Sequence, residues 1–405
     1  MKNEIKKSDK LDGVRYEIRG EAVDMAAQME LEGEQIIRLN IGNLAPYGFD
    51  APKEVIGDVV LNLRKAQGYT ESKGIFPARK AIMQYYQLQN LPNLNIENIF
   101  LGNGVSEMII MSMQALLNAG DEMLVPSPDY PLWSAAVNLA GGKAVHYGCK
   151  EEEGWIPDLE DMRAKITPRT RGIIVINPNN PTGAVYPRSV LEQIVELARE
   201  FGLMLFSDEI YDHLIMDDIE FTSIASLAPD LFCATFNGLS KSYRVTGFRS
   251  GWLVFSGDVE RGRDYISGIN LLASIRLCPN APAQHIIQTC IGGYQSVREF
   301  VEPGGRIYEQ RDYVYQMLSA IPGISVVKPQ AAFYIFPKYD KERFDFAGDE
   351  DFALQLLKEE NVLVVPGSGF DHRGDDHFRI VYLPEISTLR TVGKRLTRFF
   401  ERHTK

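Results

Sequence analysis

One lysine of this chain lies in a setting that suits it to chemistry on carbonyl groups. Lys241 occupies a short polar turn after the apolar run 231–236, and Arg249 follows just before a second apolar run, 251–255. A neighbouring cation lowers the pKa of an amine, and a neutral amine forms imines with aldehydes. On this stretch alone a solvated loop lysine is the favoured interpretation, because most lysines are exposed. The other motifs of the chain decide between these interpretations.

A glycine-rich turn, Gly102-Asn103-Gly104-Val105-Ser106-Glu107, opens a helix pattern after the apolar run 99–101. Glycines allow a ligand to approach the backbone closely, and a helix N-terminus favours an anion such as phosphate. The dinucleotide fingerprint would require glycine in place of Glu107, and the P-loop would require a Gly-Lys-Ser/Thr sequence. A structural turn with Ser106 as the N-cap is the alternative.

Polar residues also follow two further apolar runs. The turn Asn177-Pro178-Asn179-Asn180-Pro181-Thr182-Gly183 follows the run 173–176, and it offers either an amide donor at a fixed position or a plain β-turn. Asp208 follows the run 203–206, and Tyr211 lies one turn beyond it. A carboxylate at the end of a buried strand is costly unless it meets a cation or a donor. Asp208 is therefore either an N-cap or the counter-ion of a protonated ring nitrogen.

One arginine, Arg379, stands inside an apolar strand pattern between Phe378 and Ile380. A buried arginine needs an anionic partner, and a bidentate grip on a substrate carboxylate or an internal salt bridge would supply one. The preceding segment 371–377 mixes histidine and aspartate, but its spacing matches no tight metal motif. We interpret it as a solvated loop and expect no metal site. No Gly-x-Ser-x-Gly elbow is present, which disfavours an α/β-hydrolase.

The elements that must position these residues alternate along the chain. Short apolar runs recur between residues 99 and 255, and most are separated by helix-length patterns such as 106–118 and 189–201. Apolar runs of this kind are typical of strands buried on both faces. The alternation predicts an α/β fold with a large, mostly parallel seven-stranded sheet sandwiched by helices. Ligands bind at the carboxyl ends of such strands, where the polar motifs fall.

The sequence pattern changes after about residue 300. Helix patterns at 305–321, 351–360 and 387–401 alternate there with short apolar runs. A chain of 405 residues is long enough for two domains. We predict a large cofactor-binding domain at residues 50–304. Residues 1–49, with an N-terminal arm, and residues 305–405 are expected to form a smaller α+β domain.

Composition limits the partners of the chain. A net charge of -11 disfavours nucleic acid and anionic membranes, although local charge still permits small anionic substrates. The four cysteines form no Cys-x-x-Cys pair, so neither a zinc ribbon nor a disulfide framework is indicated. The charged N-terminus is followed by no apolar h-region, and no apolar run reaches the roughly 20 residues of a membrane span. We expect a cytoplasmic protein.

Taken together, these residues resemble the fold-type I aminotransferases that use pyridoxal 5'-phosphate. The resemblance covers nearly the whole chain and rests on a set of motifs in order: 177–183, Asp208 with Tyr211, Ser240-Lys241, Arg249 and Arg379. More closely, the chain is similar to bacterial alanine aminotransferases of the glutamate–pyruvate type. Overall similarity carries that narrower match, in stretches at 16–20, 39–43, 66–69, 109–133 and 236–252.

The resemblance implies a role for each motif residue. Lys241 would bond covalently to the cofactor aldehyde and then move the proton at the substrate Cα, while Asp208 would pair with the pyridine nitrogen. The ring's phenolic oxygen would accept hydrogen bonds from Asn180 and Tyr211, and Tyr130 would stack on the ring. The other expected contacts are Gly104, Val105, Ser106, Ser240 and Arg249 at the phosphate, and Gly42, Asn180 and Arg379 at the substrate.

The resemblance also implies a homodimer with shared active sites, because Tyr69 would reach the phosphate of the partner subunit. The chain departs from its relatives at three points. Gly238 replaces a serine that many of them have, Tyr130 replaces the tryptophan common in aspartate aminotransferases, and the arm reads Gly42-Asn43-Leu44 where proline is common. The first departure removes one phosphate hydroxyl, and the alanine-type enzymes share it.

Substrate choice raises a separate question, because one pocket must accept both a methyl group and a γ-carboxylate. A fixed buried arginine would be left unpaired when alanine binds, whereas a mobile arginine at the mouth could stay solvated until glutamate arrives. Arg19 is our candidate, and a surface pairing with Glu17 or Glu21 is the alternative.

Two other activities remain open at this point, and a third is disfavoured. The amino donor could be aspartate or an aromatic amino acid. A pyridoxal-phosphate lyase acting on cysteine S-conjugates would use the same lysine, aspartate and arginine. A non-catalytic regulator would require a DNA-binding domain, for which the first 40 or so residues leave no room.

Overall fold

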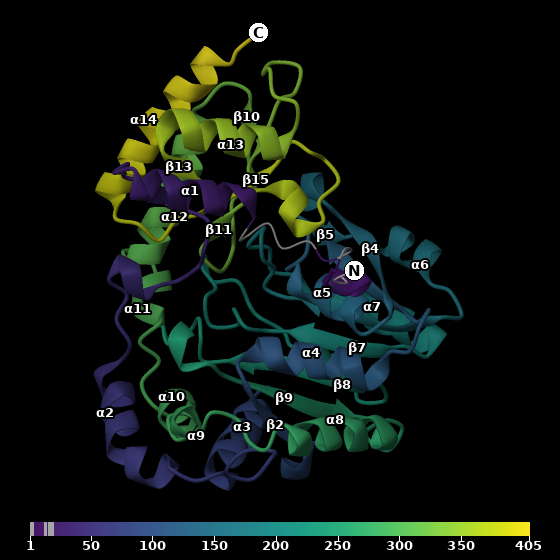
Figure 1. Ribbon diagram of the computed structural model, residues 1–405. Helices are drawn as coiled ribbons and strands as arrows, with labels where there is room; N and C mark the ends of the chain where they lie inside the picture. The colour runs from purple at the N-terminus through teal and green to yellow at the C-terminus, as the bar shows by residue number, and fades with distance from the viewer. Residues whose placement is uncertain (1–3, 12–13, 15–19) are drawn as a thin grey trace.

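The computed structural model describes residues 4–11, 14 and 20–405 of the chain. A large sheet with its helices occupies the lower and middle part of the view in Figure 1, and a smaller group of helices and short strands lies above it. The lower body comes from the middle of the chain. The upper body joins the C-terminal region to a segment near the N-terminus.

The large body is built on one twisted sheet. Its strands are β2 (Ile99–Asn103), β3 (Glu122–Ser127), β4 (Lys143–Lys150), β5 (Ile156–Pro157), β6 (Thr170–Ile176), β7 (Met204–Asp208), β8 (Phe232–Gly238) and β9 (Ser250–Gly257). Within the described residues their order is β2-β9-β8-β7-β6-β3-β4-β5. β9 runs antiparallel to β2 and β8, β5 runs antiparallel to β4, and the other pairs are parallel.

The predicted mostly parallel sheet is therefore confirmed, and the apolar runs between residues 99 and 255 supply seven of its strands, β2, β3, β4, β6, β7, β8 and β9. The structure adds β5 at the edge, where Cys149 pairs with Pro157. β5 is only two residues long, too short to carry a periodic signal in the sequence.

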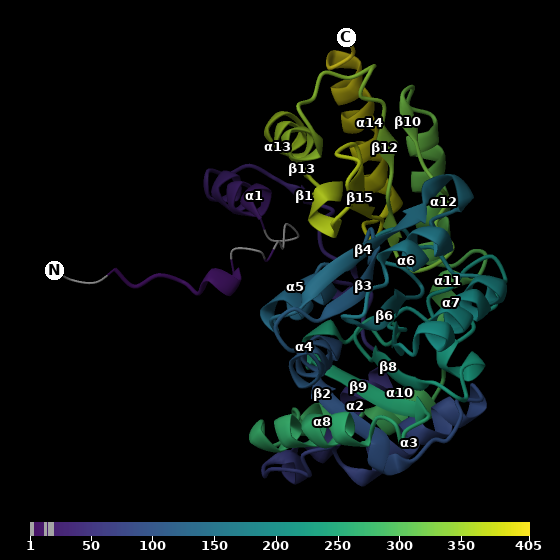
Figure 2. The same cartoon turned by 90° about the vertical axis from the view of Figure 1, so that its right-hand side faces the viewer.

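Helices cover both faces of this sheet, as Figure 2 shows with α4 (Val105–Leu116), α5 (Leu132–Leu139) and α8 (Arg263–Ile275) on the left and α3 (Phe76–Leu88) and α7 (Arg188–Phe201) on the right. Successive residues of β6 alternate between two cores: Ile173 and Val175 join the cluster under α3 and α7, and Ile174 and Ile176 join the cluster under α4 and α5. This period-two alternation, with apolar side chains on both faces, is why the strand reads as a continuous apolar run.

Helix α7 illustrates how the covering helices form. Leu191, Ile194, Val195 and Ala198 are buried at helical spacing, so one face meets the sheet while the other carries charged residues. The helix ends at Gly202, whose φ of 65° is the left-handed conformation that glycine adopts without strain. The remaining helices of this body are α2 (Lys53–Asn62), α6 (Leu159–Lys165), α9 (Ala281–Gln284), α10 (Ile287–Gly292) and α11 (Arg298–Val301).

The smaller body brings the two ends of the chain together. Its helices are α1 (Glu21–Leu31), α12 (Arg306–Ser319), α13 (Asp349–Glu360) and α14 (Ile386–Arg402). Its strands are β1 (Ile37–Arg38), β10 (Ile324–Ser325), β11 (Tyr334–Ile335), β12 (Lys338–Tyr339), β13 (Val362–Leu363), β14 (Val365–Pro366) and β15 (Phe378–Val381). β1 pairs in parallel with β13, and β15 lies between β11 and β14. This pairing supports a domain built from both ends of the chain, although its boundaries at residues 49 and 305 remain a prediction.

Short 3-10 helices complete the described chain: Asp9–Leu11, Ala45–Tyr47, Leu63–Ala66, Ile96–Asn98, Glu151–Glu153, Ile224–Leu227, Thr246–Phe248 and Gly367–Phe370. Among the residues that the structure describes, no helix combines the length and the apolar character that a membrane span requires.

Our interpretation of residues 371–377 as a solvated loop is wrong for its second half. His377 is buried, and its ring stacks on Phe336 with centroids 5.0 Å apart. Its Nδ1 lies 2.6 Å from Asp376 Oδ1, and its Nε2 lies 3.3 Å from Glu151 Oε2. The segment leads directly into β15, and the packing of that strand draws the two residues inside.

Candidate active site

A cavity of about 180 Å³ lies at the carboxyl ends of the sheet strands, where the two bodies meet. Most of the residues singled out in the sequence line it, although they come from segments far apart in the chain. The lining residues are Ile41, Gly42, Val105, Ser106, Ile109, Tyr130, Ile176, Asn180, Asp208, Ile210, Tyr211, Ser240, Lys241, Thr246, Arg249, Tyr334 and Arg379.

Lys241 enters the cavity from the turn that follows β8. Its Nζ donates a hydrogen bond to the carbonyl oxygen of Gly42 at 2.8 Å and lies 5.5 Å from the centre of the Phe333 ring. Both contacts come from the upper body, so the amine is held between the sheet and the arm. This arrangement holds the amine of the half-buried Lys241 at the cavity wall, where it can meet a bound carbonyl compound.

Asp208 is the last residue of β7 and is fully enclosed by the fold. Its carboxylate accepts hydrogen bonds from Trp133 Nε1 at 3.0 Å and from the backbone N–H of Ile210 at 3.3 Å. Burial raises the pKa of this carboxyl from 3.8 to about 6, and the Trp133 hydrogen bond opposes the rise. A carboxylate in this position is stabilised further by a cation placed in the cavity.

Trp133 was not among the predicted site residues. Its ring packs edge-on against Phe236 and Phe206 with centroids 5.1 and 6.4 Å away, which places the indole N–H under β7. The sequence offers only a general indication of this contact. A buried tryptophan N–H needs a hydrogen-bond acceptor, but the sequence does not show which residue supplies it.

Arg379 projects from β15 towards the sheet and is almost fully buried. Its Nη1 donates to Asn180 Oδ1 at 2.9 Å, and its Nη2 donates to the carbonyl oxygen of Asn40. The rings of Tyr334 and Phe370 lie 4.4 and 4.6 Å from the guanidinium carbon. The two Nη groups of the guanidinium, which form a fork, are thus fixed in one orientation at the cavity wall, as recognition of a carboxylate requires.

Two tyrosines meet beside this arginine. Tyr211, one turn after Asp208, has its hydroxyl 2.9 Å from the hydroxyl of Tyr334, which the sequence did not single out. Burial, followed by the nearby Tyr334, raises the pKa of Tyr211 well above its ordinary value, so the phenol stays protonated. Gly42 faces Tyr334 and its neighbour Phe333, and a Cβ there would collide with the Tyr334 hydroxyl and the Phe333 ring. This close approach explains why the arm carries glycine at position 42.

The opposite end of the cavity has the character of an anion site. The backbone N–H groups of Val105 and Ser106 open helix α4, and Arg249 lies beside them. Arg249 Nη1 donates to Thr246 O at 2.9 Å and to Ser240 Oγ at 3.4 Å. Unpaired N–H groups of a first helical turn, a hydroxyl and a guanidinium together make a phosphate cradle.

Gly104, and not Ser106, is the N-cap of α4, so the alternative role that we gave Ser106 is wrong. Gly104 has a φ of 81°, and a Cβ there would collide with the Arg249 guanidinium. The side chain of Ser106 is consequently left to line the cavity.

Among the described residues, two predicted site residues, Gly104 and Tyr69, do not line this cavity, although Gly104 directly precedes Val105, which does. Tyr69 is 81% exposed on the surface of the large body, next to the 3-10 helix Leu63–Ala66. Arg19 lies outside the residues that the structure describes. The contributions expected of Tyr69 and Arg19 therefore stay predictions.

Comparison with known proteins identifies what the chain resembles as a whole. The family described as aminotransferase class I and II matches residues 34–395. The glutamate-pyruvate aminotransferase AlaA of Escherichia coli is 56% identical over 395 residues, which cover 98% of each chain. The alanine aminotransferase of Mycobacterium tuberculosis is 51% identical over 393 residues, which cover 97% of this chain and 92% of the relative.

Solved structures agree with these relatives. An aminotransferase from Escherichia coli superposes with a TM-score of 0.98 at 55% identity and complete coverage of both chains. The alanine aminotransferase from Pyrococcus furiosus superposes with a TM-score of 0.94 at 39% identity, covering 98% of this chain and all of the other.

Proposed function

Because this chain belongs to the class I and II aminotransferases, we propose that it transfers an amino group between L-alanine and 2-oxoglutarate, giving pyruvate and glutamate. The relatives that match it over nearly their full length carry the names alanine and glutamate-pyruvate aminotransferase, which supports this substrate pair. The cofactor of the family is pyridoxal 5'-phosphate. The observation that carries the proposal is the meeting of Lys241, Asp208 and Arg379 in one cavity.

The donor set of the cavity suits this cofactor. The phosphate would lie between the first turn of α4 and Arg249, the ring nitrogen at Asp208, and the phenolic oxygen near Asn180 and Tyr211. A buried carboxylate whose hydrogen-bond donors are neutral is matched by a protonated ring nitrogen. When bound, the cofactor supplies an electron sink that stabilises negative charge at the substrate Cα.

Each side chain of the cavity has a separate role in the reaction. Lys241 Nζ, held at the cavity wall, takes the proton from the substrate Cα and would deliver it to C4' of the cofactor. Arg379 orients the α-carboxylate, because its fork is already fixed by Asn180 and Asn40. Asp208 keeps the ring nitrogen protonated, and the Tyr211 phenol donates to the cofactor oxygen. Burial beneath the smaller body restricts the access of water to these steps.

The reaction is tested by single-turnover spectroscopy with alanine in the absence of an acceptor. A transaminase converts the bound aldehyde cofactor to the amine and releases one pyruvate for each site. A lyase acting on cysteine S-conjugates would leave the cofactor as the aldehyde. A panel of amino donors then separates alanine from aspartate and aromatic amino acids, and a preference for either of the latter would contradict the proposed pair.

We further propose a cytoplasmic homodimer in which Tyr69 completes the phosphate site of the partner. Exposed apolar side chains occur on α2, the following 3-10 helix, the start of α3 and α8: Val60, Leu61, Leu63, Phe76, Leu271 and Ile275. Apolar surface of this extent supports a protein interface. Mixing Lys241→Ala and Tyr69→Phe chains tests the sharing, because one site of the hybrid would be intact. No recovery of activity on mixing would contradict it.

A further inference from the structure

The glycine-rich turn at residues 102–107, which begins helix α4, is the phosphate turn of the proposed cofactor site. Glu107, which stands where a dinucleotide fingerprint would have glycine, holds this turn from outside the cavity. Its carboxylate accepts hydrogen bonds from the backbone N–H of Asn103 at 2.8 Å and from Asn103 Nδ2 at 2.9 Å. Asn103 directly precedes Gly104, the N-cap of α4. The same carboxylate pairs with Nη1 of Arg276, at the end of α8, so the turn is fixed through an ion pair that is largely withdrawn from solvent.

Arg276 also reaches a second segment. Its Nη2 donates to the carbonyl oxygens of Ser72 at 2.9 Å and of Leu101 at 3.3 Å. Ser72 belongs to the stretch that directly follows Tyr69, and Leu101 lies in β2, just before the phosphate turn. One guanidinium therefore joins the segment of Tyr69 to the turn of its own chain.

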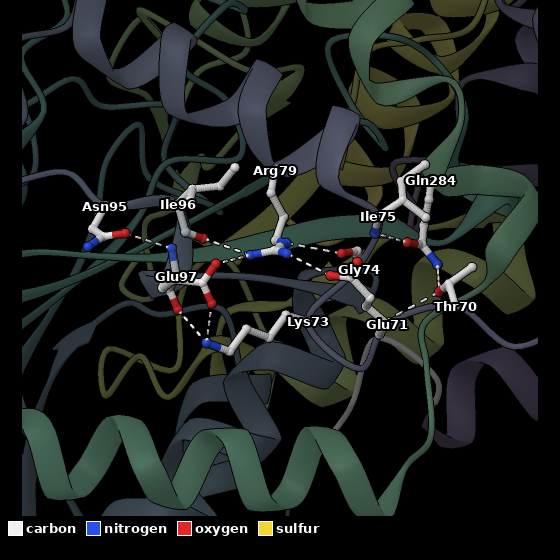
Figure 3. Close-up of polar contacts among 10 residues, drawn as sticks. All are labelled: Thr70, Glu71, Lys73, Gly74, Ile75, Arg79, Asn95, Ile96, Glu97 and Gln284. Carbon is white, nitrogen blue, oxygen red and sulfur yellow. Dashed lines mark hydrogen bonds and ion pairs between the residues drawn. The ribbon is translucent and has the colours of Figure 1, made fainter.

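The segment 70–75 is anchored along its length, as Figure 3 shows. Arg79 donates to Glu71 Oε2 at 2.7 Å and to Gly74 O at 3.0 Å. Gln284 holds its two ends, since its Oε1 accepts from the N–H of Ile75 at 2.8 Å and its Nε2 donates to Thr70 Oγ1 at 3.0 Å. A segment so firmly fixed presents the exposed Tyr69 in a set position, which lowers the entropy lost when it binds a ligand.

We propose that Arg276 is a positioning residue for two phosphate sites of the dimer at once. Through Glu107 it fixes the turn that binds the phosphate in its own chain, and through Ser72 it fixes the segment that offers Tyr69 to the phosphate of the partner. The second half of this inference rests on the shared sites proposed above. It follows that one arginine in each chain ties the two cofactor sites together.

The first test measures cofactor affinity by titrating the apoenzyme with pyridoxal 5'-phosphate and following absorbance. Arg276→Gln removes the charge and the fork, and we expect the dissociation constant to rise about tenfold, as for loss of a charge-assisted hydrogen bond. Arg263→Gln is the matched control, because Arg263 begins the same helix and pairs with Glu260 on an exposed surface. An unchanged affinity in Arg276→Gln, or an equal change in the control, would overturn the inference.

Hybrid dimers separate the two functions of Arg276. One chain carries Lys241→Ala, so the absorbance of lysine-bound cofactor reports only the site of the other chain. Arg276→Gln in the reporting chain loosens the turn at Asn103, and in the silenced chain it loosens the segment that offers Tyr69. We expect weaker cofactor binding at the reporting site in both arrangements. Weakening in one arrangement alone refutes the double role.

Two more hybrids complete the design. Arg276→Lys keeps a cation beside Glu107 but cannot hold Ser72 as well, so it should restore affinity only when placed in the reporting chain. If Arg276→Gln does not fold, Arg276→Lys replaces it in the measurements of cofactor affinity. Tyr69→Phe in the silenced chain checks the premise: no effect there means that the sites are not shared. An effect of Tyr69→Phe without an effect of Arg276→Gln in the same chain refutes the present inference alone.

Discussion

Arg379 Nη1 donates a hydrogen bond to Asn180 Oδ1 at 2.9 Å, which joins strand β15 of the smaller body to the polar turn after β6. The residue expected to grip the substrate is thus tied to a residue expected to contact the cofactor. The turn itself is held rigid, because Asn179 Oδ1 accepts from the N–H and the hydroxyl of Thr182. Substrate and cofactor are therefore positioned by one connected set of hydrogen bonds.

Arg379→Lys should weaken every substrate alike. A single amine replaces the fork, so the bidentate contact with the α-carboxylate, which all four substrates carry, is lost. We expect the KM of alanine, glutamate, pyruvate and 2-oxoglutarate each to rise by roughly 10- to 150-fold, the equivalent of about 1.5–3 kcal/mol. Steady-state kinetics with each substrate measure this, and a rise confined to one substrate pair would assign Arg379 to side-chain recognition.

Arg19→Ala should discriminate between the substrates. If Arg19 meets the γ-carboxylate, the KM of glutamate and 2-oxoglutarate rises by roughly 10- to 150-fold, and that of alanine and pyruvate changes little. The Arg379 variant is the natural comparison, because it acts on the carboxylate that all substrates share. Equal effects on both pairs, or none, would remove Arg19 from the site.

Lys241→Ala should still bind the cofactor while losing the covalent link. The phosphate cradle at α4 and Arg249 does not involve the lysine amine, so affinity for the phosphate group persists. Borohydride reduction of the wild-type holoenzyme followed by peptide mapping should place the label on Lys241. Recovery of the label on another lysine would refute the assignment.

Asp208→Asn should make the apoprotein more stable at neutral pH while abolishing most activity. The pKa of Asp208 is raised from 3.8 to about 6 on folding, so between these values the folded state holds a proton that the unfolded state has lost. Stability therefore falls as pH rises through this window, and the full penalty, up to about 3 kcal/mol, applies above pH 6. Asparagine removes the penalty together with the charge that the ring nitrogen needs.

Urea unfolding of the two apoproteins at about pH 4 and pH 8 checks this, since the other titrating groups are common to both. The variant should gain stability relative to wild type only at the higher pH, and turnover of its holoenzyme should fall by orders of magnitude. Equal stability differences at both pH values would show that Asp208 is not the titrating group. Near-normal turnover would rule out its role at the ring.

Tyr334→Phe tests the residue that only the structure revealed. Removing its hydroxyl breaks the contact with Tyr211 Oη and leaves that phenol with one partner fewer. We expect a loss of about 0.5–1.5 kcal/mol in transition-state stabilisation, which is roughly 2- to 13-fold in kcat/KM. Tyr211→Phe and the double variant complete a double-mutant cycle, and additive effects would show that the two hydroxyls are not coupled.

The sequence by itself determined the sheet and the edge at which the site lies. Apolar runs such as 173–176 form strands that are buried on both faces. Burial of both faces requires successive residues to be apolar, so the strand is recognisable in the local sequence. The motif residues Asn180, Asp208 and Lys241 could be placed at strand ends for the same local reason. The family was also readable, because the order of these residues along the chain does not depend on packing.

The tertiary structure alone decided which polar groups meet. Trp133 donates to Asp208, Arg379 to the carbonyl of Asn40, and Arg276 to Ser72, and each pair joins segments far apart in the chain. The tertiary structure also shows that Gly104, and not Ser106 as the sequence suggested, is the N-cap of α4, and that His377 is buried. A buried polar group must find a partner, but local sequence expresses only that need. Which partner satisfies it depends on how the helices and sheets pack, and that is settled by the whole chain.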